Sequence, residues 1–427
     1  MIRKEAMQII LDEIKNEPIV SANGYISRDL FELREKNTNF YMIGSMGLAS
    51  SIGLGVAIKK PRKRIFVFDG DGNILMNLGS LTTTGTLKPK NLVHIIFDNN
   101  SHESTGGQPT NSNKIQISEL AEISNYHVFV ATKKFQLRNI LKQLKKIPGP
   151  IMIVIKIKNS QIHSHRVSLD PQIIKNRFMK AIILAAGVGS RLGDLTKELP
   201  KPLVDVNGKS IIERQISSFR KAGVNEITIV TGYKRDKFIF KDIEYVFVPN
   251  YEDGEQACSL MIALKQISGD VIISFGDIIF EYKIIEQILN TKNDIVIGVE
   301  PKWRESYEKR MDNPPTTSDF IAIKNGKIIK LSRNLKEFDE DCVITEFSGL
   351  FKLSTKGSKI ITEKYEFLEQ NHSGKFHHAV SLKKAKIIDL LQELNENGVN
   401  MEAISLKGKW CEIDTQQDLE IAKKMFK

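Results

Sequence analysis

The sequence predicts an α/β protein built from two doubly wound domains. The length of 427 residues is about twice that of an ordinary domain, so two domains are expected. Short apolar runs of strand type alternate with amphipathic stretches of helical period, as in parallel sheets covered by helices. A strand followed by a glycine-rich turn occurs twice, at residues 65–73 and 179–192, which places one such unit in each domain.

The expected elements alternate in both halves of the chain. In the first half, an amphipathic helix at 2–16 precedes strands at 65–68, 93–97 and 151–155. In the second half, an amphipathic helix at 211–222 lies among strands at 181–184, 227–230, 271–275 and 295–299. This alternation favours helices on both faces of each sheet.

The composition is that of a globular protein in a reducing compartment. Hydrophobic residues make up 41% of the chain and charged residues 26%, which excludes a collagen-like or wholly disordered protein. Cys258, Cys342 and Cys411 are far apart and form no CxxC pair. The first residues are too charged for a secretory signal, and no apolar run approaches the roughly 20 residues that span a bilayer. We therefore expect a cytoplasmic protein.

A polar, basic stretch separates the two halves. We expect domains at residues 1–170 and 179–427, joined by a linker at 171–178 that contains a proline. Residues 1–178 hold 25 Lys and Arg against 14 Asp and Glu, whereas residues 179–427 hold 37 of each. The net charge of +11 therefore belongs to the first domain.

This charge does not indicate nucleic-acid binding. The basic run at 59–64 is accompanied by no recognition helix, aromatic-interleaved basic stripe or zinc module. We expect part of the charge to face an acidic partner subunit or to attract multiply charged substrates and cofactors. A lysine-rich surface without a specific role is the alternative.

Polar residues follow two strands of the first domain. Asp71 comes after one strand, and Asn99 and Ser101 come after the next. In an open parallel sheet, these strand ends are where backbone N–H groups attract anions. Asp71 is a hard oxygen ligand suited to Mg²⁺, and Gly70 and Gly72 let the backbone close around a phosphate. Taken alone, such a turn is weak evidence for a metal and is more typical of a solvent-facing turn.

The order of the motifs resembles the C-terminal cofactor domain of thiamine diphosphate (TPP) enzymes. The similar stretches are NFYMIGSMGLASSIGLG at 39–55, FDGDGNILMNLGSL at 68–81 and STGGQPT at 104–110. Within these enzymes the chain is most similar to phosphonopyruvate and sulfopyruvate decarboxylases, over nearly all of residues 1–160. The resemblance implies bound TPP and Mg²⁺.

The resemblance also implies roles for single residues. Asp71 and Asn99 would supply side-chain ligands to the metal, and Ser101 its main-chain carbonyl. Met46 would hold TPP in its bent form, with ordinary core packing as the alternative. His102 stands where a tyrosine is expected, as a proton carrier or as a plain loop residue. The cofactor contacts implied nearby are Gly44, Ser45, Gly70, Gly72 and Asn73.

One part of a TPP enzyme is missing from the sequence. The resemblance implies a glutamate on a separate pyrimidine-binding domain that activates TPP, and no room for that domain precedes Asp71. We therefore expect the first domain to need a separate pyrimidine-domain subunit within a homo- or hetero-oligomer. The alternative is a non-catalytic module that has kept the TPP fold.

The second domain opens with a phosphate-binding pattern. LAAGVGSRL at 184–192 follows a strand directly, so its N–H groups and Arg191 can wrap a triphosphate. PKPL at 200–203 then places Lys201 where it can neutralise charge on the α-phosphate. Together the two motifs resemble sugar-nucleotide pyrophosphorylases and small-alcohol cytidylyltransferases, which implies a Rossmann-like (GT-A-like) nucleotidyltransferase domain. The implied nucleotide contacts are Leu184, Ala185, Ala186, Gly187, Gly189, Ser190, Arg191 and Lys201.

Nucleotidyl transfer requires Mg²⁺ between phosphates and therefore carboxylates on the sheet. Asp277 in ISFGDIIF and Asp414 in WCEIDT match the metal aspartates of the resembled enzymes. Either can instead be a turn acid or a helix cap, and Asp414 precedes a helical pattern. We expect Arg191, Lys201 and Asp277 to be catalytic.

Three stretches narrow the resemblance to phosphocholine and phosphonate cytidylyltransferases, which implies CTP. They are ERQISSFRKAGVNEITIVTGY, VPNYEDGEQACSLMIAL and WCEIDTQQDLE. Acids or an aromatic ring in the acceptor pocket could then hold an ammonium group. A plain surface role is the alternative for Glu252. The implied acceptor residues are Tyr251, Glu252, Ser259, Glu346 and Trp410.

The two resemblances together predict a bifunctional phosphonate-biosynthesis protein. Phosphonopyruvate decarboxylation gives an aldehyde that transamination or reduction converts to 2-aminoethylphosphonate or 2-hydroxyethylphosphonate. A CTP:phosphonate cytidylyltransferase would turn either into a CMP-phosphonate and pyrophosphate. The alternative is a phosphocholine cytidylyltransferase or sugar-1-phosphate nucleotidyltransferase fused to a sulfopyruvate decarboxylase-like module.

Overall fold

The protein consists of two compact units, Met1–Lys175 and Asn176–Lys427. The computed structural model describes residues 1–160, 163–177, 179–267, 269–308, 310, 312, 314–315 and 318–427. The predicted linker contains helix α8 (Pro171–Asn176), and its last residue, 178, lies outside the described residues. None of the helices that the structure describes is long and apolar enough to cross a membrane.

The first unit is built on a six-stranded sheet in the order β2-β1-β3-β4-β8-β7, and every pairing is parallel. The three strands expected from sequence are present and slightly longer than predicted. The strands are β1 (Ile19–Ser21), β2 (Asn39–Tyr41), β3 (Ile65–Gly70), β4 (Leu92–Asp98), β7 (His127–Ala131) and β8 (Ile151–Lys156).

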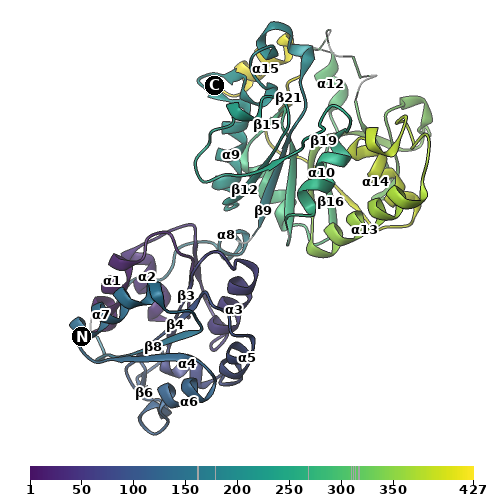
Figure 1. The fold of residues 1–427 in the computed structure, drawn as a ribbon. Helices are drawn as coiled ribbons and strands as arrows, with labels where there is room; N and C mark the ends of the chain where they lie inside the picture. The colour runs from purple at the N-terminus through teal and green to yellow at the C-terminus, as the bar shows by residue number, and fades with distance from the viewer. Residues whose placement is uncertain are drawn as a thin grey trace. The chain divides into compact units, whose positions relative to one another are not determined.

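Helices cover both faces of this sheet, as the doubly wound pattern predicts (Figure 1). Alternate residues of β4 point to opposite faces, so Ile95 packs in the core with α1 and α7, and Ile96 in the core with α5 and α6. The helices are α1 (Arg3–Glu13), α2 (Tyr25–Leu33), α3 (Ala49–Lys59), α4 (Asp71–Leu75), α5 (Gly79–Leu87), α6 (Ile117–Ile123) and α7 (Lys134–Gln143).

The second unit is built on a nine-stranded sheet, whose central path runs β13-β12-β9-β14-β19-β16-β20. Unlike the first sheet it is mixed, because β19 runs antiparallel to both β14 and β16. The strands are β9 (Lys180–Ala185), β12 (Glu226–Thr231), β13 (Glu244–Phe247), β14 (Val271–Phe275), β16 (Ile295–Glu300), β17 (Phe320–Lys324), β18 (Lys327–Ser332), β19 (Val343–Leu353) and β20 (Glu402–Ser405).

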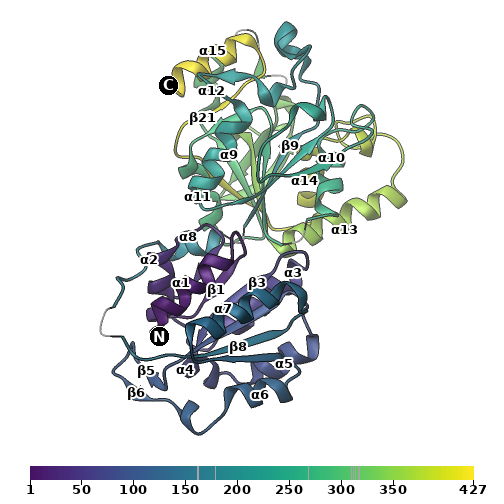
Figure 2. The same ribbon diagram turned by 60° about the vertical axis from the view of Figure 1, so that its left-hand side comes forward.

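The second sheet also has helices on both faces (Figure 2). Helices α9 (Ile211–Lys221) and α11 (Tyr282–Asn290) pack on one face. The other face is covered by α10 (Gln256–Leu264), α13 (Thr355–Asn371) and α14 (Ile387–Glu396). Two short strands, β15 (Ile278–Phe280) and β21 (Trp410–Glu412), pair with each other, and α12 (Trp303–Tyr307) and α15 (Gln416–Met425) complete the unit.

Candidate active sites

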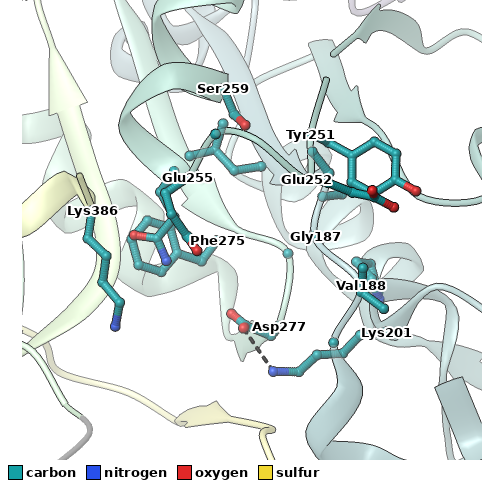
Figure 3. Close-up of a pocket in the computed structure, with 18 of the residues that line it drawn as sticks. Gly187, Val188, Lys201, Tyr251, Glu252, Glu255, Ser259, Phe275, Asp277 and Lys386 are labelled. Atoms are coloured by element: carbon teal, nitrogen blue, oxygen red, sulfur yellow. Dashed lines mark hydrogen bonds and ion pairs between the residues drawn. The ribbon is translucent and has the colours of Figure 1, made fainter. Parts of the chain in front are cut away.

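A cavity of about 490 Å³ in the second unit lies where β9 and β14 end (Figure 3). Seven of the eight predicted nucleotide contacts line it, and the side chain of the eighth, Ser190, lies outside the described part of the structure. Gly189 has a φ of +68°, and a Cβ there would meet the Lys201 side chain at 2.5 Å. This glycine therefore lets the loop close directly over Lys201.

Lys201 is buried at the centre of this site. Its Nζ donates to Asp277 Oδ2 at 2.9 Å and to Asp414 Oδ1. Burial lowers the pKa of Lys201, but the two carboxylates outweigh burial, so its pKa is raised and the ammonium stays charged. Arg191 Nη1 lies 2.8 Å from Asp414 Oδ2, with its side chain about half exposed (54%) toward the cavity.

Three carboxylates gather beside Lys201. Asp277 follows β14, whereas Glu412 and Asp414 lie at the end of β21, which pairs with β15 next to Asp277. One oxygen from each lies within 4.8 Å of the others. Sequence analysis missed Glu412, although its i, i+2 spacing from Asp414 on a strand end was an available signal.

The pKa values of Glu412 and Asp414 are shifted in opposite directions. Burial raises the pKa of Glu412 well above its usual value, and the neighbouring Asp414 and Asp277 raise it further. Burial also acts to raise the pKa of Asp414, but Lys201 and Arg191 reverse this, so the pKa of Asp414 is lowered. Asp277 Oδ1 is buried without a hydrogen-bond partner. An unpaired carboxylate oxygen among hard oxygen donors fits a Mg²⁺ site.

Asp414 is not the cap of the helix that follows it. The N-cap of α15 is Thr415, whose Oγ1 accepts a hydrogen bond from the Asp418 N–H. Asp418 Oδ2 in turn accepts from the N–H groups of Thr415 (2.9 Å) and Asp414 (3.1 Å), and its Oδ1 accepts from Arg310 Nε at 2.6 Å. The capping group therefore holds the Asp414 backbone and leaves its carboxylate for the site.

The predicted acceptor residues separate into three groups. Tyr251, Glu252 and Ser259 line the large cavity, with Glu252 exposed at its rim. Glu346 lines a smaller adjoining cavity of about 60 Å³. Trp410 lines neither cavity: the pairing of β21 with β15 buries it in the core, where its indole N–H donates to the Ser348 carbonyl at 2.9 Å. The prediction for Trp410 is therefore wrong.

Sequence analysis also missed residues that no motif marks. Lys386, just before α14, lines both cavities. Asp319 and Ser318, just before β17, line the smaller one. These residues reach the site only through tertiary packing, so the sequence carries no local signal for them.

The first unit has a cavity of about 70 Å³ where β3 and β4 end. Parallel pairing of Gly70 with Phe97 brings the two strand ends together. Seven of the predicted residues line the cavity, but Gly44 and Ser45 do not. The lining residues predicted from sequence are Met46, Gly70, Asp71, Gly72, Asn73, Asn99 and Ser101.

Asp71 is buried and held by two hydroxyl groups. Thr110 Oγ1 donates to Asp71 Oδ2 at 2.5 Å, and Ser112 Oγ lies 3.0 Å from the same oxygen. Burial is the main cause that raises the pKa of Asp71. Thr110 and Ser112 were missed because they lie on a distant loop that folds back on the turn.

The oxygen donors of this cavity are oriented for a ligand. Asn99 Nδ2 donates to Glu103 Oε2 at 3.2 Å, so the amide oxygen of Asn99 faces Ser101, whose N–H it accepts at 3.2 Å. Ser101 Oγ and Asn23 Oδ1, both in the lining, are buried without hydrogen-bond partners. A carboxylate, an amide oxygen and unpaired polar atoms fit a magnesium diphosphate. His102 also lines the cavity, beside Gly72.

Two family models match the chain, one in each unit. Residues 24–155 match the thiamine pyrophosphate enzyme C-terminal TPP binding domain. Residues 181–403 match the MobA-like NTP transferase domain, which is more than half of the chain. The matches agree with the two resemblances seen in the sequence.

Curated relatives divide in the same way. A CTP:phosphoglutamine cytidylyltransferase from Campylobacter jejuni is 34% identical over 57% of this chain and 98% of its own length. A sulfopyruvate decarboxylase subunit beta from Methanococcus maripaludis is 38% identical over 43% of this chain and 98% of its own length. A phosphonopyruvate decarboxylase from Streptomyces viridochromogenes is 37% identical over 41% of this chain but only 45% of its own length. The chain belongs to the MobA-like NTP transferase family through its second unit and carries a TPP enzyme C-terminal TPP binding domain as its first.

Proposed function

We propose that the second unit transfers CMP from CTP to a phosphonate and releases pyrophosphate. The observation that carries this proposal is the buried Lys201, held between Asp277 and Asp414 beneath a glycine-rich loop. A phosphonate oxygen attacks the α-phosphorus of CTP, and the bond from that phosphorus to the bridging oxygen breaks. The electron pair leaves with pyrophosphate, so no other reactant is needed.

Each site residue has a distinct task in this reaction. The N–H groups of the 184–189 loop and the guanidinium of Arg191 bind the triphosphate. Lys201 neutralises the charge that builds on the α-phosphate. Asp277 and Asp414 would hold Mg²⁺, which would supply positive charge to neutralise the phosphates.

The nucleotide and the acceptor are inferred from separate observations. CTP is supported by the name of the Campylobacter relative, a CTP-dependent cytidylyltransferase. An ammonium-bearing acceptor is supported by Glu346, whose Oε2 is buried without a hydrogen-bond partner in the smaller cavity. A buried, unpaired carboxylate oxygen is costly, and an ammonium group would relieve that cost. This favours 2-aminoethylphosphonate over 2-hydroxyethylphosphonate.

Steady-state kinetics with four acceptors test the proposal. With CTP and Mg²⁺, kcat/KM is expected to be highest for 2-aminoethylphosphonate, followed by 2-hydroxyethylphosphonate. Phosphocholine and glucose-1-phosphate should be used at least tenfold less well. A preference for phosphocholine or glucose-1-phosphate would overturn the phosphonate assignment, and a preference for UTP or dTTP would overturn the choice of CTP.

We further propose that the first unit binds TPP and Mg²⁺ as one half of a phosphonopyruvate decarboxylase. The chain aligns with nearly the whole of a protein named as one subunit, but with less than half of the Streptomyces phosphonopyruvate decarboxylase. That difference supports a separate subunit carrying the pyrimidine-binding domain. A phosphonate substrate is favoured over a sulfonate because a phosphonate product has a use for the cytidylyltransferase to which this unit is joined.

Decarboxylation assays with and without that subunit test this second proposal. The protein mixed with a separate pyrimidine-domain subunit should release CO₂ from phosphonopyruvate faster than from sulfopyruvate. The full-length protein alone should be inactive. Full activity of the protein alone would contradict the need for a partner, and failure of the mixture to bind TPP would support a non-catalytic module.

A further inference from the structure

Two cavities of the second unit adjoin each other. They share the lining residues Gln256, Phe275 and Lys386, along with Arg191 and Asp277. The 184–189 loop lines the larger cavity. The smaller cavity extends away from that loop toward β19. An acceptor reaching into the smaller cavity must therefore pass the shared residues.

Lys386 is the shared cation whose ammonium group has no carboxylate within hydrogen-bond distance among the described residues. Among the described residues that line the larger cavity, the cations are Arg191, Lys201 and Lys386. Arg191 and Lys201 lie within 2.9 Å of Asp414 and Asp277 respectively. Among the described residues, the carboxylate paired with Lys386 Nζ is Asp319, whose Oδ1 lies 3.8 Å away, which is longer than a hydrogen bond. The Lys386 ammonium therefore keeps its donors for a ligand.

The backbone around Lys386 is fixed against the wall of the larger cavity. Its N–H donates to Asp389 Oδ2 at 2.9 Å in the first turn of α14. The N–H of Ala257 in α10 donates to the Ala385 carbonyl at 3.2 Å, and the N–H of Glu255 donates to the Lys383 carbonyl at 3.0 Å. The Cα of Lys386 therefore has a defined position beside the cavity before any ligand binds.

Lys386 also lies apart from the nucleotide cations. In Figure 3, Lys386 and Lys201 lie on opposite sides of Asp277. Lys201 and Arg191 are positioned to neutralise the triphosphate. A dianionic nucleophile beside that triphosphate needs a cation of its own, because like charges repel. Lys386 meets this need.

We propose that Lys386 binds the anionic phosphorus group of the acceptor and orients one of its oxygens toward the α-phosphorus of the nucleotide. This inference rests on the proposed nucleotidyl transfer, but it holds for a phosphonate and for a phosphate alike. Asp319 acts as a positioning residue that directs the Lys386 side chain. The acceptor is thus recognised by charge at its reacting end, independently of what fills the smaller cavity.

Kinetics of Lys386→Met test this role, because methionine keeps the apolar stem and removes the charge. The KM of the acceptor should rise about 10- to 100-fold, as expected for a lost charge-assisted hydrogen bond. The KM of CTP should stay within about twofold. Lys383→Met is the matched control, since Lys383 is exposed in the same turn, and it should leave both constants unchanged. Lys386→Arg should recover part of the loss.

The possible outcomes separate this inference from the proposed function. If phosphocholine proves the best acceptor and Lys386→Met raises its KM, the phosphonate assignment fails while the role of Lys386 stands. If no acceptor KM changes, or if the KM of CTP rises equally, the role of Lys386 is overturned. Asp319→Asn gives a second test that does not depend on the folding of the first variant: it should raise the acceptor KM by a smaller factor, and no change would argue against positioning by Asp319.

Discussion

Lys201 donates a hydrogen bond to Asp277 at 2.9 Å although 76 positions separate the two residues. The contact joins the loop after β9 to the turn after β14, which are neighbouring parallel strands. A buried lysine needs such partners, since an unpaired buried charge is strongly destabilising. The same ion pair therefore serves the fold and, in the proposed reaction, prepares a cation for the α-phosphate.

Replacing Lys201 with methionine should reduce kcat for pyrophosphate release by at least about 100-fold, because a preorganised group that stabilises developing charge is lost. Lys283→Met, on an exposed position of α11, is the control and should retain full activity. Continuous pyrophosphate detection measures both variants. Residual activity of Lys201→Met within tenfold of the wild type would exclude the role assigned to Lys201.

Replacing Asp277 with asparagine should raise the Mg²⁺ concentration for half-maximal activity more than tenfold. The substitution keeps the size of the side chain but removes the charge that a hard cation requires. Titration of the rate with MgCl₂ at saturating CTP measures the change, with Glu402→Gln on β20 as the control. An unchanged Mg²⁺ requirement would show that the metal is held elsewhere.

The stability of the second unit should depend on pH through Glu346. Burial raises the pKa of Glu346 above its usual value of 4.5, so the folded state binds this proton more tightly than the unfolded state. Stability is therefore lost as the pH rises from about 4.5 through the folded-state pKa. Glu346→Gln removes this loss, and its amide oxygen can still accept the hydrogen bond that Tyr307 donates at 2.6 Å.

Thermal unfolding at two pH values measures the effect. Glu346→Gln should unfold at a higher temperature than the wild type at pH 7.5, and the two should converge near pH 4. Glu340→Gln, in an exposed loop, should match the wild type at both values. A wild type more stable than Glu346→Gln at pH 7.5 would mean that the carboxylate is already neutralised in the ligand-free protein.

Much of the fold and of both sites follows from local sequence. Buried parallel strands such as β3, β4 and β9 are nearly continuous apolar runs, and glycines mark the turns after β3 and β9, so these strands and turns could be predicted. The antiparallel direction of β19 could not be predicted, because strand direction is set by long-range pairing and not by the local residue pattern.

The errors at the sites have the same origin. Trp410 lies close to Glu412 and Asp414 in sequence, but the pairing of β21 with β15 buries it in the core with α9 and α11. Conversely, Lys386 and Ser112 reach the sites from segments that carry no motif. Site residues within a motif were predictable because one short segment sets their relative positions. The residues that complete the pockets reach them only through packing between distant segments.

Two glycines of α3 should respond in opposite ways to alanine. A Cβ on Gly53 would lie 2.1 Å from Val67 Cγ2, whereas a Cβ on Gly55 would meet nothing within 4 Å. Gly53→Ala should therefore lower the free energy of unfolding of the first unit by about 1–3 kcal/mol through overpacking. Gly55→Ala should raise it by about 0.5–1 kcal/mol, since glycine is unfavourable inside a helix. Scanning calorimetry of the full-length variants compares them, and an equal effect of both would show that α3 does not pack closely on β3.

The central claim, transfer of CMP to a phosphonate oxygen, is tested most directly by ³¹P NMR of the full-length protein with CTP, Mg²⁺ and 2-aminoethylphosphonate. The account predicts a new pair of coupled resonances, one phosphonate and one phosphate, and one equivalent of pyrophosphate for each CTP consumed. An unchanged spectrum from a preparation that converts phosphocholine or glucose-1-phosphate would contradict it.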